Sequence, residues 1–318
     1  MNTAEIEEIP ARDAYTILPR NQRTRLFSFF IAILPALLLW EIAAIKVNVR
    51  LPKAARKRLF RLGARFALLA LVIELLESIV PESGLSPLAH ACVRALFLAA
   101  VPEELVKFAA VSRFGKRELD EMGPGIAILI GVGCSLGFAV FENKLYVLGG
   151  GFSVWLIRAF SAVPMHAIFG FTMGSFMSLS WQSRKGSADR LMLLALIVPI
   201  AFHFSYDFLI YLQAYAPALL WPQKALPPLM LVEGLFALIL TNHAVNGQTA
   251  LYGSHVPVDP KGNRALGLSV VMLLLSCIIL ALAVEFPWVH GIAICEALPL
   301  VFTLDLGLLA LARSRGHA

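Results

Sequence analysis

Hydrophobic residues occur in long, nearly unbroken runs along most of this chain, separated by short polar connectors. A helix needs about 20 consecutive apolar residues to cross the hydrocarbon core of a bilayer. Runs this long and continuous favour helices over the strands of a barrel, which are shorter and alternate in polarity. The pattern therefore predicts an all-α fold, a polytopic transmembrane helix bundle. The candidate spans are 26–45, 66–82, 86–112, 124–147, 154–181, 190–215, 228–247, 265–284 and 290–312.

Basic residues gather in every second connector, as the positive-inside rule expects of cytoplasmic loops. This alternation fits the second to the ninth candidate span and places the C-terminus in the cytoplasm of a multi-pass protein of the cell (inner) membrane. The first candidate, 26–45, follows an arginine-containing tail and breaks the alternation, so the prediction is eight or nine spans. The very basic connector 46–65 is either an amphipathic helix on the anionic leaflet or a charged topology anchor.

Composition agrees with a membrane protein, because 58% of the residues are hydrophobic and 15% are charged, against about 25% charged in soluble domains. The net charge of +6 lies at the ends of the apolar runs rather than on one face, which argues against nucleic-acid binding. The four cysteines are scattered singly without a C-x-x-C spacing. Nothing in this spacing suggests a disulfide framework or a thiolate metal site. The lipid bilayer is a predicted partner, because the composition is that of a membrane protein.

Polar clusters interrupt four successive apolar segments of the chain. An ionisable side chain at bilayer depth costs about 2.5 to 3.5 kcal/mol on insertion scales, so its repeated presence indicates a function. We interpret the four clusters as one buried hydrolytic site. They are Glu103-Glu104 with Lys107, Glu142-Asn143, His166, and His203 with Asp207.

The first cluster combines two adjacent carboxylates with one lysine. Lys107 follows Glu103 by four residues and Glu104 by three, so it can reach either across one helical turn. Two neighbouring carboxylates repel in a low dielectric, and the lysine can hold one ionised while the other keeps a proton. One group can then take a proton from water and another return it. The structural alternative is an ion pair, which needs only one carboxylate.

Each remaining cluster has a structural alternative of its own. Glu142 can be a helix-end carboxylate that reaches the membrane surface, and His166 can be an interhelical hydrogen-bonding group. His203 and Asp207 lie one turn apart, so the carboxylate can orient the imidazole, help to hold a metal, or merely join two helices. The conjunction of all four clusters in consecutive spans favours a common site.

The motif order EE-x-x-K, F-x-x-x-E, H and H-x-x-x-D resembles the PrsW family of intramembrane proteases, within the superfamily of type II CAAX prenyl endopeptidases. Related motifs in that superfamily form a site inside the helix bundle. The resemblance covers about residues 86–215 and implies an intramembrane peptidase. Glu142 stands where the prenyl endopeptidases have histidine, which favours PrsW-like activity over CAAX processing. The expected regions are an N-terminal tail at 1–25, first spans with the basic amphipathic connector at 26–85, a catalytic helix core at 86–215, and C-terminal flanking spans at 216–318.

The resemblance implies that Glu103 and Glu104 include the catalytic glutamate and its partner, and our mechanistic hypothesis gives the polar residues the following roles. One glutamate of the 103–104 pair, preferably Glu103, acts as general base on water, and the other glutamate and Lys107 tune its charge. His166 and His203 bind the oxyanion or hold the water. Asp207 orients His203, and Glu142 with Asn143 contacts the substrate backbone or the leaving amine. The predicted catalytic residues are thus Glu103, Glu104, Lys107, Glu142, His166, His203 and Asp207, with Asn143 as a substrate-binding residue.

The sequence predicts the cofactor and the substrate less directly than the site residues. The chain has no H-E-x-x-H, so no cofactor is favoured, and zinc is the alternative because two histidines with carboxylates suit it. Its ligands would be His166, His203, Glu104 and Glu142. The resemblance suggests a membrane-anchored protein substrate, such as an anti-sigma factor in regulated proteolysis. The competing interpretations are a proton-coupled transporter, because intramembrane Glu and His chains also relay protons, and a non-catalytic membrane scaffold.

Overall fold

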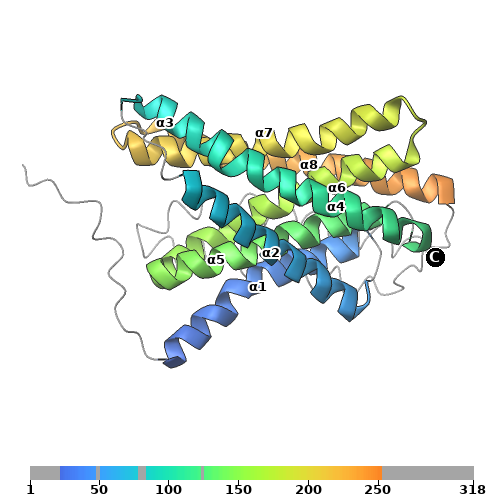
Figure 1. Ribbon diagram of the computed structural model, residues 1–318, viewed down its shortest axis with the longest axis horizontal. Coiled ribbons are helices and arrows are strands. Elements are labelled where there is room, and N and C mark those ends of the chain that lie inside the picture. Colours follow the sequence, from blue (N-terminus) through green and yellow to red (C-terminus); the bar gives the residue numbers. More distant parts are fainter. Residues whose placement is uncertain (1–21, 48–50, 78–83, 123–124, 253–318) are drawn as a thin grey trace, which may run out of the picture.

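The computed structural model describes residues 22–47, 51–77, 84–122 and 125–252, and its regular elements there are all helices (Figure 1). The all-α prediction is confirmed for these residues, whereas the candidate spans 265–284 and 290–312 and the greater part of the tail 1–25 lie outside the described parts. The elements are α1 (Gln22–Val47), α2 (Lys53–Glu77), α3 (Pro87–Val93), the π-helix η2 (Arg94–Ala100), α4 (Val101–Met122), α5 (Ile126–Phe160), α6 (Ala162–Gln182), α7 (Ser187–Tyr215) and α8 (Trp221–Tyr252).

Helices α5 and α6 form the centre of the bundle, and the other helices pack around them. Most of α6 is buried, whereas α7 and α8 expose many of their leucine, isoleucine and valine side chains, as lipid-facing helices do. Within the described ranges, four helical segments are long and apolar enough to cross a membrane. They are Ile126–Tyr146, Ile157–Gln182, Ser187–Tyr215 and Trp221–Gly247.

Helix α5 bends sharply, although its residues are helical throughout. The side chain of Arg158 donates from Nε to Asn143 Oδ1 at 3.2 Å, yet the two residues are 15 positions apart. A straight helix would separate them by about 22 Å, more than two side chains can span. The chain therefore reverses between them, and α5 contributes to two spans, Ile126–Tyr146 and Ile157–Gln182. These two segments match the predicted spans 124–147 and 154–181.

Helices α3, η2 and α4 follow one another along α7 and together correspond to the predicted span 86–112 (Figure 1). The π-helical segment η2 ends at Ala100, just before α4 begins. Segments of π-helix are rare and often occur at functional sites, because the wider turn changes which side chains face inward. Here the wider turn precedes the Glu103–Glu104 pair, which lies in the first turn of α4.

Glycines allow α2 and α5 to approach each other until their backbones touch. A Cβ atom added at Gly137 would lie 2.4 Å from the backbone oxygen of Phe60. Close approach through small residues is a usual way for membrane helices to pack. The helix pair therefore tolerates no side chain at this position.

Substitution of Gly137 by alanine is expected to lower the melting temperature of the purified protein in detergent. Overpacking of this kind destabilises by about 1 to 3 kcal/mol, because only backbone atoms could move away. The matched control is Gly186→Ala, since nothing lies within 4 Å of a Cβ at that position. An equal melting temperature for the two variants would contradict the close packing of α2 on α5.

Candidate active site

The carboxylate pair of α4 is buried and shares one lysine. Glu104 and Lys107 are both 0% exposed, and Glu103 is 4% exposed. Lys107 Nζ donates to Glu104 Oε1 at 2.7 Å and to Glu103 Oε2 at 3.2 Å. The spacing along α4 therefore brings both carboxylates to one ammonium group, as the sequence predicted. Two buried carboxylates beside each other are tolerated because this cation compensates their charge.

Lys107 also connects the carboxylates to the imidazole of His166 on α6. Lys107 Nζ lies 3.3 Å from His166 Nδ1 and 4.3 Å from the centre of the Phe138 ring. An ammonium group can only donate, so Nδ1 is the acceptor and Nε2 carries the ring hydrogen. His166 Nε2 in turn lies 2.8 Å from Glu142 Oε2 on α5, a carboxylate oxygen that accepts. His166 thus bridges Lys107 and Glu142 as a neutral ring in one defined tautomer.

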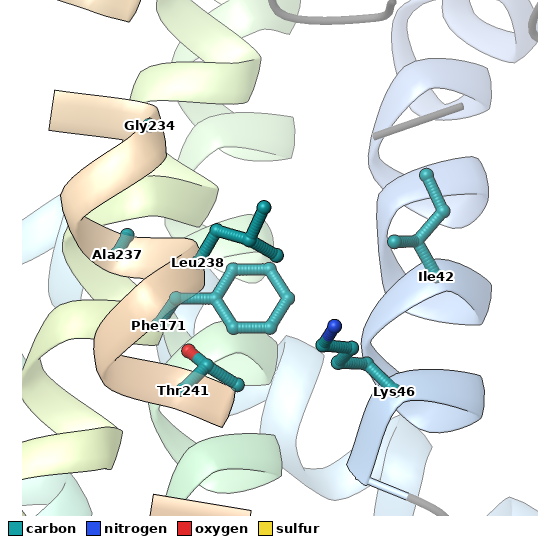
Figure 2. A pocket seen from close by; sticks show the side chains of 7 residues that line it. All are labelled: Ile42, Lys46, Phe171, Gly234, Ala237, Leu238 and Thr241. Atoms are coloured by element: carbon teal, nitrogen blue, oxygen red, sulfur yellow. The ribbon is translucent and has the colours of Figure 1, made fainter. Parts of the chain in front are cut away.

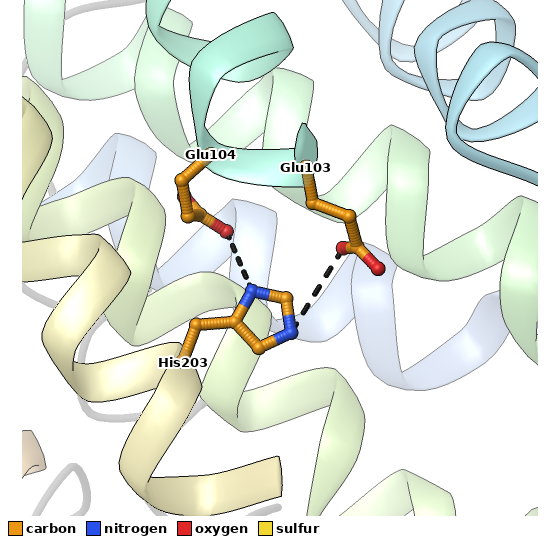
Figure 3. Close-up of side chains that lie close together, drawn as sticks. All are labelled: Glu103, Glu104 and His203. Carbon is orange, nitrogen blue, oxygen red and sulfur yellow. Dashed lines mark hydrogen bonds and ion pairs between the residues drawn. The ribbon is translucent and has the colours of Figure 1, made fainter. Parts of the chain in front are cut away.

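His203 on α7 lies against both glutamates of α4 (Figure 3). Its Nδ1 is 3.0 Å from Glu104 Oε1, and its Nε2 is 3.2 Å from Asp207 Oδ2 and 3.9 Å from Glu103 Oε2. The ring stacks on Phe169 of α6, with 4.8 Å between ring centres. Both ring nitrogens therefore face carboxylates, an arrangement that suits a positively charged imidazolium donating from both sides.

Every predicted catalytic residue joins this single network of polar contacts, which four helices supply. α4 contributes Glu103, Glu104 and Lys107, and α6 contributes one histidine. α7 contributes His203 and Asp207, and α5 contributes Glu142. The side chains of Glu142 and Asp207 are 25% and 18% exposed, respectively, whereas the rest of the network is almost wholly buried. Glu142 and Asp207 are thus the parts of the network that water can reach from outside.

Arg158 belongs to this network and was not among the predicted site residues. Its Nη2 lies 3.0 Å from Glu142 Oε1, its Nε donates to Asn143 Oδ1 at 3.2 Å, and its Cζ lies 4.0 Å from the centre of the Tyr146 ring. A basic residue inside the apolar run 154–181 is the signal that could have identified it. Asn143 is buried and accepts from this arginine.

Three of the buried side chains are suitably placed to hold a metal ion. One ligand atom each from Glu103, Glu104 and His203 lies within 4.8 Å of the others, and Glu104 Oε2 is buried without a hydrogen-bond partner in the described residues. Two carboxylates and an imidazole suit a catalytic zinc ion by type and number. The expected zinc ligands His166 and Glu142 instead bond to each other.

A pocket of the described region lies elsewhere, between α1, α6 and α8, and contains the amine of a buried lysine (Figure 2). It shares no residue with the carboxylate and histidine network. Its lining residues are Ile42, Lys46, Phe171, Gly234, Ala237, Leu238 and Thr241.

Sequence comparisons identify a family with the expected chemistry. A sequence profile described as "PrsW family intramembrane metalloprotease" matches residues 52–240. The chain is 30% identical over 181 residues to Protease PrsW of Shouchella clausii, and the aligned region covers 57% of this chain and 79% of that protein. It is 26% identical over 197 residues to Protease PrsW of Clostridioides difficile, covering 58% and 79%, respectively. The chain is 35% identical over 100 residues to Protease PrsW of Bacillus subtilis, and the aligned region covers 31% of this chain and 45% of that protein. No solved structure matches the chain.

Proposed function

Because this chain belongs to the PrsW family of intramembrane proteases, we propose that it hydrolyses a peptide bond with a water molecule activated by Glu103. The observation that carries the proposal is the convergence of Glu103, Glu104 and His203 from two helices into one buried group. General acid–base hydrolysis needs a carboxylate that can take and return a proton beside a donor for the oxyanion. Both are available here.

The water would bind between Glu103 and His203. Glu103 Oε2 and His203 Nε2 are 3.9 Å apart, too far for a direct hydrogen bond and close enough for one oxygen atom to bond to both. Glu103 accepts a proton as the water oxygen attacks the carbonyl carbon. His203 then donates to the developing oxyanion, and Glu103 returns the proton to the amine nitrogen as the C–N bond breaks.

The other residues keep this pair in position. Glu104 Oε1 accepts from both Lys107 and His203, so it fixes the imidazole while the ammonium offsets the charge of the two carboxylates. Asp207 Oδ2 lies 3.2 Å from the same Nε2 of His203 and shares the N–H that this nitrogen offers to the water. Glu142 has one oxygen on Arg158 and the other on His166. We therefore assign Glu142 the role of holding His166, because neither of its oxygens is left to contact a substrate.

A metal ion is not needed for any of these steps. Lys107 already supplies positive charge to both carboxylates that would bind the ion, and a divalent cation beside the ammonium would be repelled. An ion bound here would be held by Glu103, Glu104 and His203 and would act as a Lewis acid on the scissile carbonyl. We propose the metal-independent mechanism, in which the carboxylate of Glu103 and the imidazole of His203 carry the chemistry.

For the substrate, we propose a membrane-anchored protein, such as an anti-sigma factor in regulated proteolysis, as the family resemblance suggests. Residues 86–215 would be the catalytic helix core, flanked by 26–85 and 216–318. The protein would reside in the cell (inner) membrane with its C-terminus in the cytoplasm, since that orientation follows from the basic connectors.

The test is cleavage by the purified chain, reconstituted with a panel of fluorescently tagged single-span membrane proteins from the same cell. We expect discrete cleavage of at least one of them, and activity within about twofold of the untreated enzyme after chelation, since Lys107 and not an ion balances the carboxylates. Metal content of the active enzyme is measured in parallel. Loss of cleavage on chelation with recovery on zinc addition would replace this mechanism with a metal-dependent one. Absence of cleavage across the panel would count against the proposed substrate class.

A further inference from the structure

Arg158 forms an ion pair with Glu142, a partly exposed carboxylate of the site. We propose that Arg158 is a positioning residue that holds Glu142, so that Glu142 in turn holds the imidazole of His166. The inference rests on the proposed function, because it takes Glu142 and His166 to serve peptide hydrolysis.

The guanidinium group of Arg158 is restrained by the segment that precedes the bend in α5. It forms an ion pair with Glu142 Oε1 at 3.0 Å, donates to Asn143 Oδ1 at 3.2 Å, and lies 4.0 Å from the centre of the Tyr146 ring. The planar group thus has an acceptor at its Nε, a carboxylate at its outer end and an aromatic ring against its face. Such a group has little freedom to leave.

Glu142 depends on this arrangement more than the other carboxylates do. Its side chain is 25% exposed, so water can compete for its oxygens. Without Arg158, the carboxylate loses the partner of Oε1 and can rotate towards the exposed side. The partner of Oε2, His166 Nε2 at 2.8 Å, would then lose its acceptor.

Loss of that acceptor affects the centre of the site through His166. The Nε2–H of His166 points at Glu142, which keeps Nδ1 free of hydrogen and facing Lys107 Nζ at 3.3 Å. A ring released from Glu142 can rotate or change tautomer. Lys107 then has no acceptor on α6, and the geometry that it imposes on Glu103 and Glu104 loosens.

Arginine suits this position better than lysine. The guanidinium group forms an ion pair with Glu142 through Nη2 and a hydrogen bond to Asn143 through Nε, whereas lysine offers one ammonium point charge without the planar face. Replacement by lysine therefore keeps a positive charge beside Glu142 but loses the contacts that hold the guanidinium group in place. It should recover only part of the activity.

The experiment measures kcat and KM of Arg158→Ala, Arg158→Lys and Glu142→Gln with the single-span protein that the wild-type chain cleaves. Removal of a group that orients a metal-ligating histidine typically changes activity by about 10- to 100-fold, and we expect a similar factor for a group that orients His166 through Glu142. We expect Arg158→Ala to lower kcat by about that factor, with KM within about twofold. Arg158→Lys should fall between Arg158→Ala and wild type. The matched control is Arg56→Ala, which removes a 3.2 Å ion pair to Glu41 between partly exposed side chains outside the site and should leave kcat within about twofold.

Two readouts separate positioning from a general loss of fold. Methylguanidinium added at millimolar concentration should raise the kcat of Arg158→Ala severalfold and leave that of Glu142→Gln unchanged. A double-mutant cycle then tests the route of the effect. If Arg158 acts through Glu142, Arg158→Ala should lower kcat no further in the Glu142→Gln background.

The possible results are distinct. If Arg158→Ala lowers kcat by the same factor in the wild-type and the Glu142→Gln backgrounds, the inference is overturned and the proposed hydrolysis stays intact. Unchanged kcat in Arg158→Ala would overturn it as well. Full activity in Glu142→Gln would remove both this inference and the role proposed for Glu142, whereas the role of Glu103 is decided by its own substitution.

Discussion

Replacement of Glu103 by glutamine is expected to lower kcat by about 10²- to 10⁴-fold, the usual contribution of a general acid–base group. Glutamine keeps the size and shape of the side chain and cannot accept the proton of the attacking water. Its amide can still contact Lys107 and the water through its oxygen, so KM should stay within about threefold. The measurement is the initial rate of cleavage of the single-span substrate by purified variant and wild-type enzyme.

Stability of the Glu103 variant should remain close to that of the wild type. The substitution removes the longer of the two Lys107 ion pairs, at 3.2 Å, whereas the 2.7 Å pair with Glu104 stays. Removal of one of two adjacent buried carboxylates also relieves their repulsion. The control is Glu41→Gln, whose side chain is 51% exposed and pairs with Arg56, and which should cleave at the wild-type rate. More than a tenth of the wild-type kcat in Glu103→Gln would contradict the assignment of the base.

Glu104→Gln should affect both activity and stability, and this difference distinguishes the two glutamates. Glu104 Oε1 accepts from Lys107 at 2.7 Å and from His203 Nδ1 at 3.0 Å, so its loss frees the ring that we expect to hold the water. The remaining oxygen of that carboxylate is buried without a partner in the described residues. Glu104 thus joins α4 to α7 through His203.

Contacts within a helix were predictable from the sequence because they follow helical geometry. Residues three and four positions apart share a face, so Lys107 was expected to reach both glutamates and His203 to reach Asp207. The ammonium of Lys107 lies 2.7 Å from Glu104 and 3.2 Å from Glu103, and the His203 ring lies 3.2 Å from Asp207, in agreement with this expectation. The apolar runs similarly indicated helices, because backbone groups inside a bilayer must bond internally.

Contacts between helices were not predictable from spacing. Glu104 and His203 are 99 positions apart, and Lys107 and His166 are 59 apart. Their meeting depends on which faces α4, α6 and α7 present to one another, and a run of leucines does not specify that. Here the expectation came from the number of polar interruptions in successive spans and from the motif order, not from a calculation of packing.

Two features of the fold could not be predicted from the sequence pattern, for physical reasons. A basic residue inside the apolar run 154–181 marks Arg158 as unusual, but nothing local shows that the chain reverses within α5 and returns Arg158 to Asn143. The π-helix η2 also has no periodicity of its own in the sequence, since one wide turn in an apolar run is set by the neighbouring helices. Both features lie beside the site, where tertiary contacts outweigh local preference.

Replacement of Lys107 by methionine is expected to be the most destabilising single change in the site. Methionine matches the length of the lysine stem and removes the ammonium group that contacts Glu103, Glu104 and His166 together. Breaking a buried ion pair by removing one partner typically costs about 3 to 5 kcal/mol, because the other charge stays buried and uncompensated. The melting temperature of the purified variant in detergent should fall accordingly, and cleavage should be abolished.

The direction in which a second substitution changes the melting temperature tests this explanation. If uncompensated carboxylate charge causes the loss of stability, Lys107→Met combined with Glu103→Gln should melt at a higher temperature than Lys107→Met alone, although Glu103→Gln by itself brings little gain. Such a reversal is not expected if Lys107 merely fills space against Phe138, whose ring centre lies 4.3 Å from its ammonium. In that case the double variant would melt no higher than the single one, and the charge-balancing role of Lys107 would have to be abandoned. A higher melting temperature without return of cleavage would instead indicate that charge balance sustains the fold, while hydrolysis needs both the lysine and the carboxylate of Glu103.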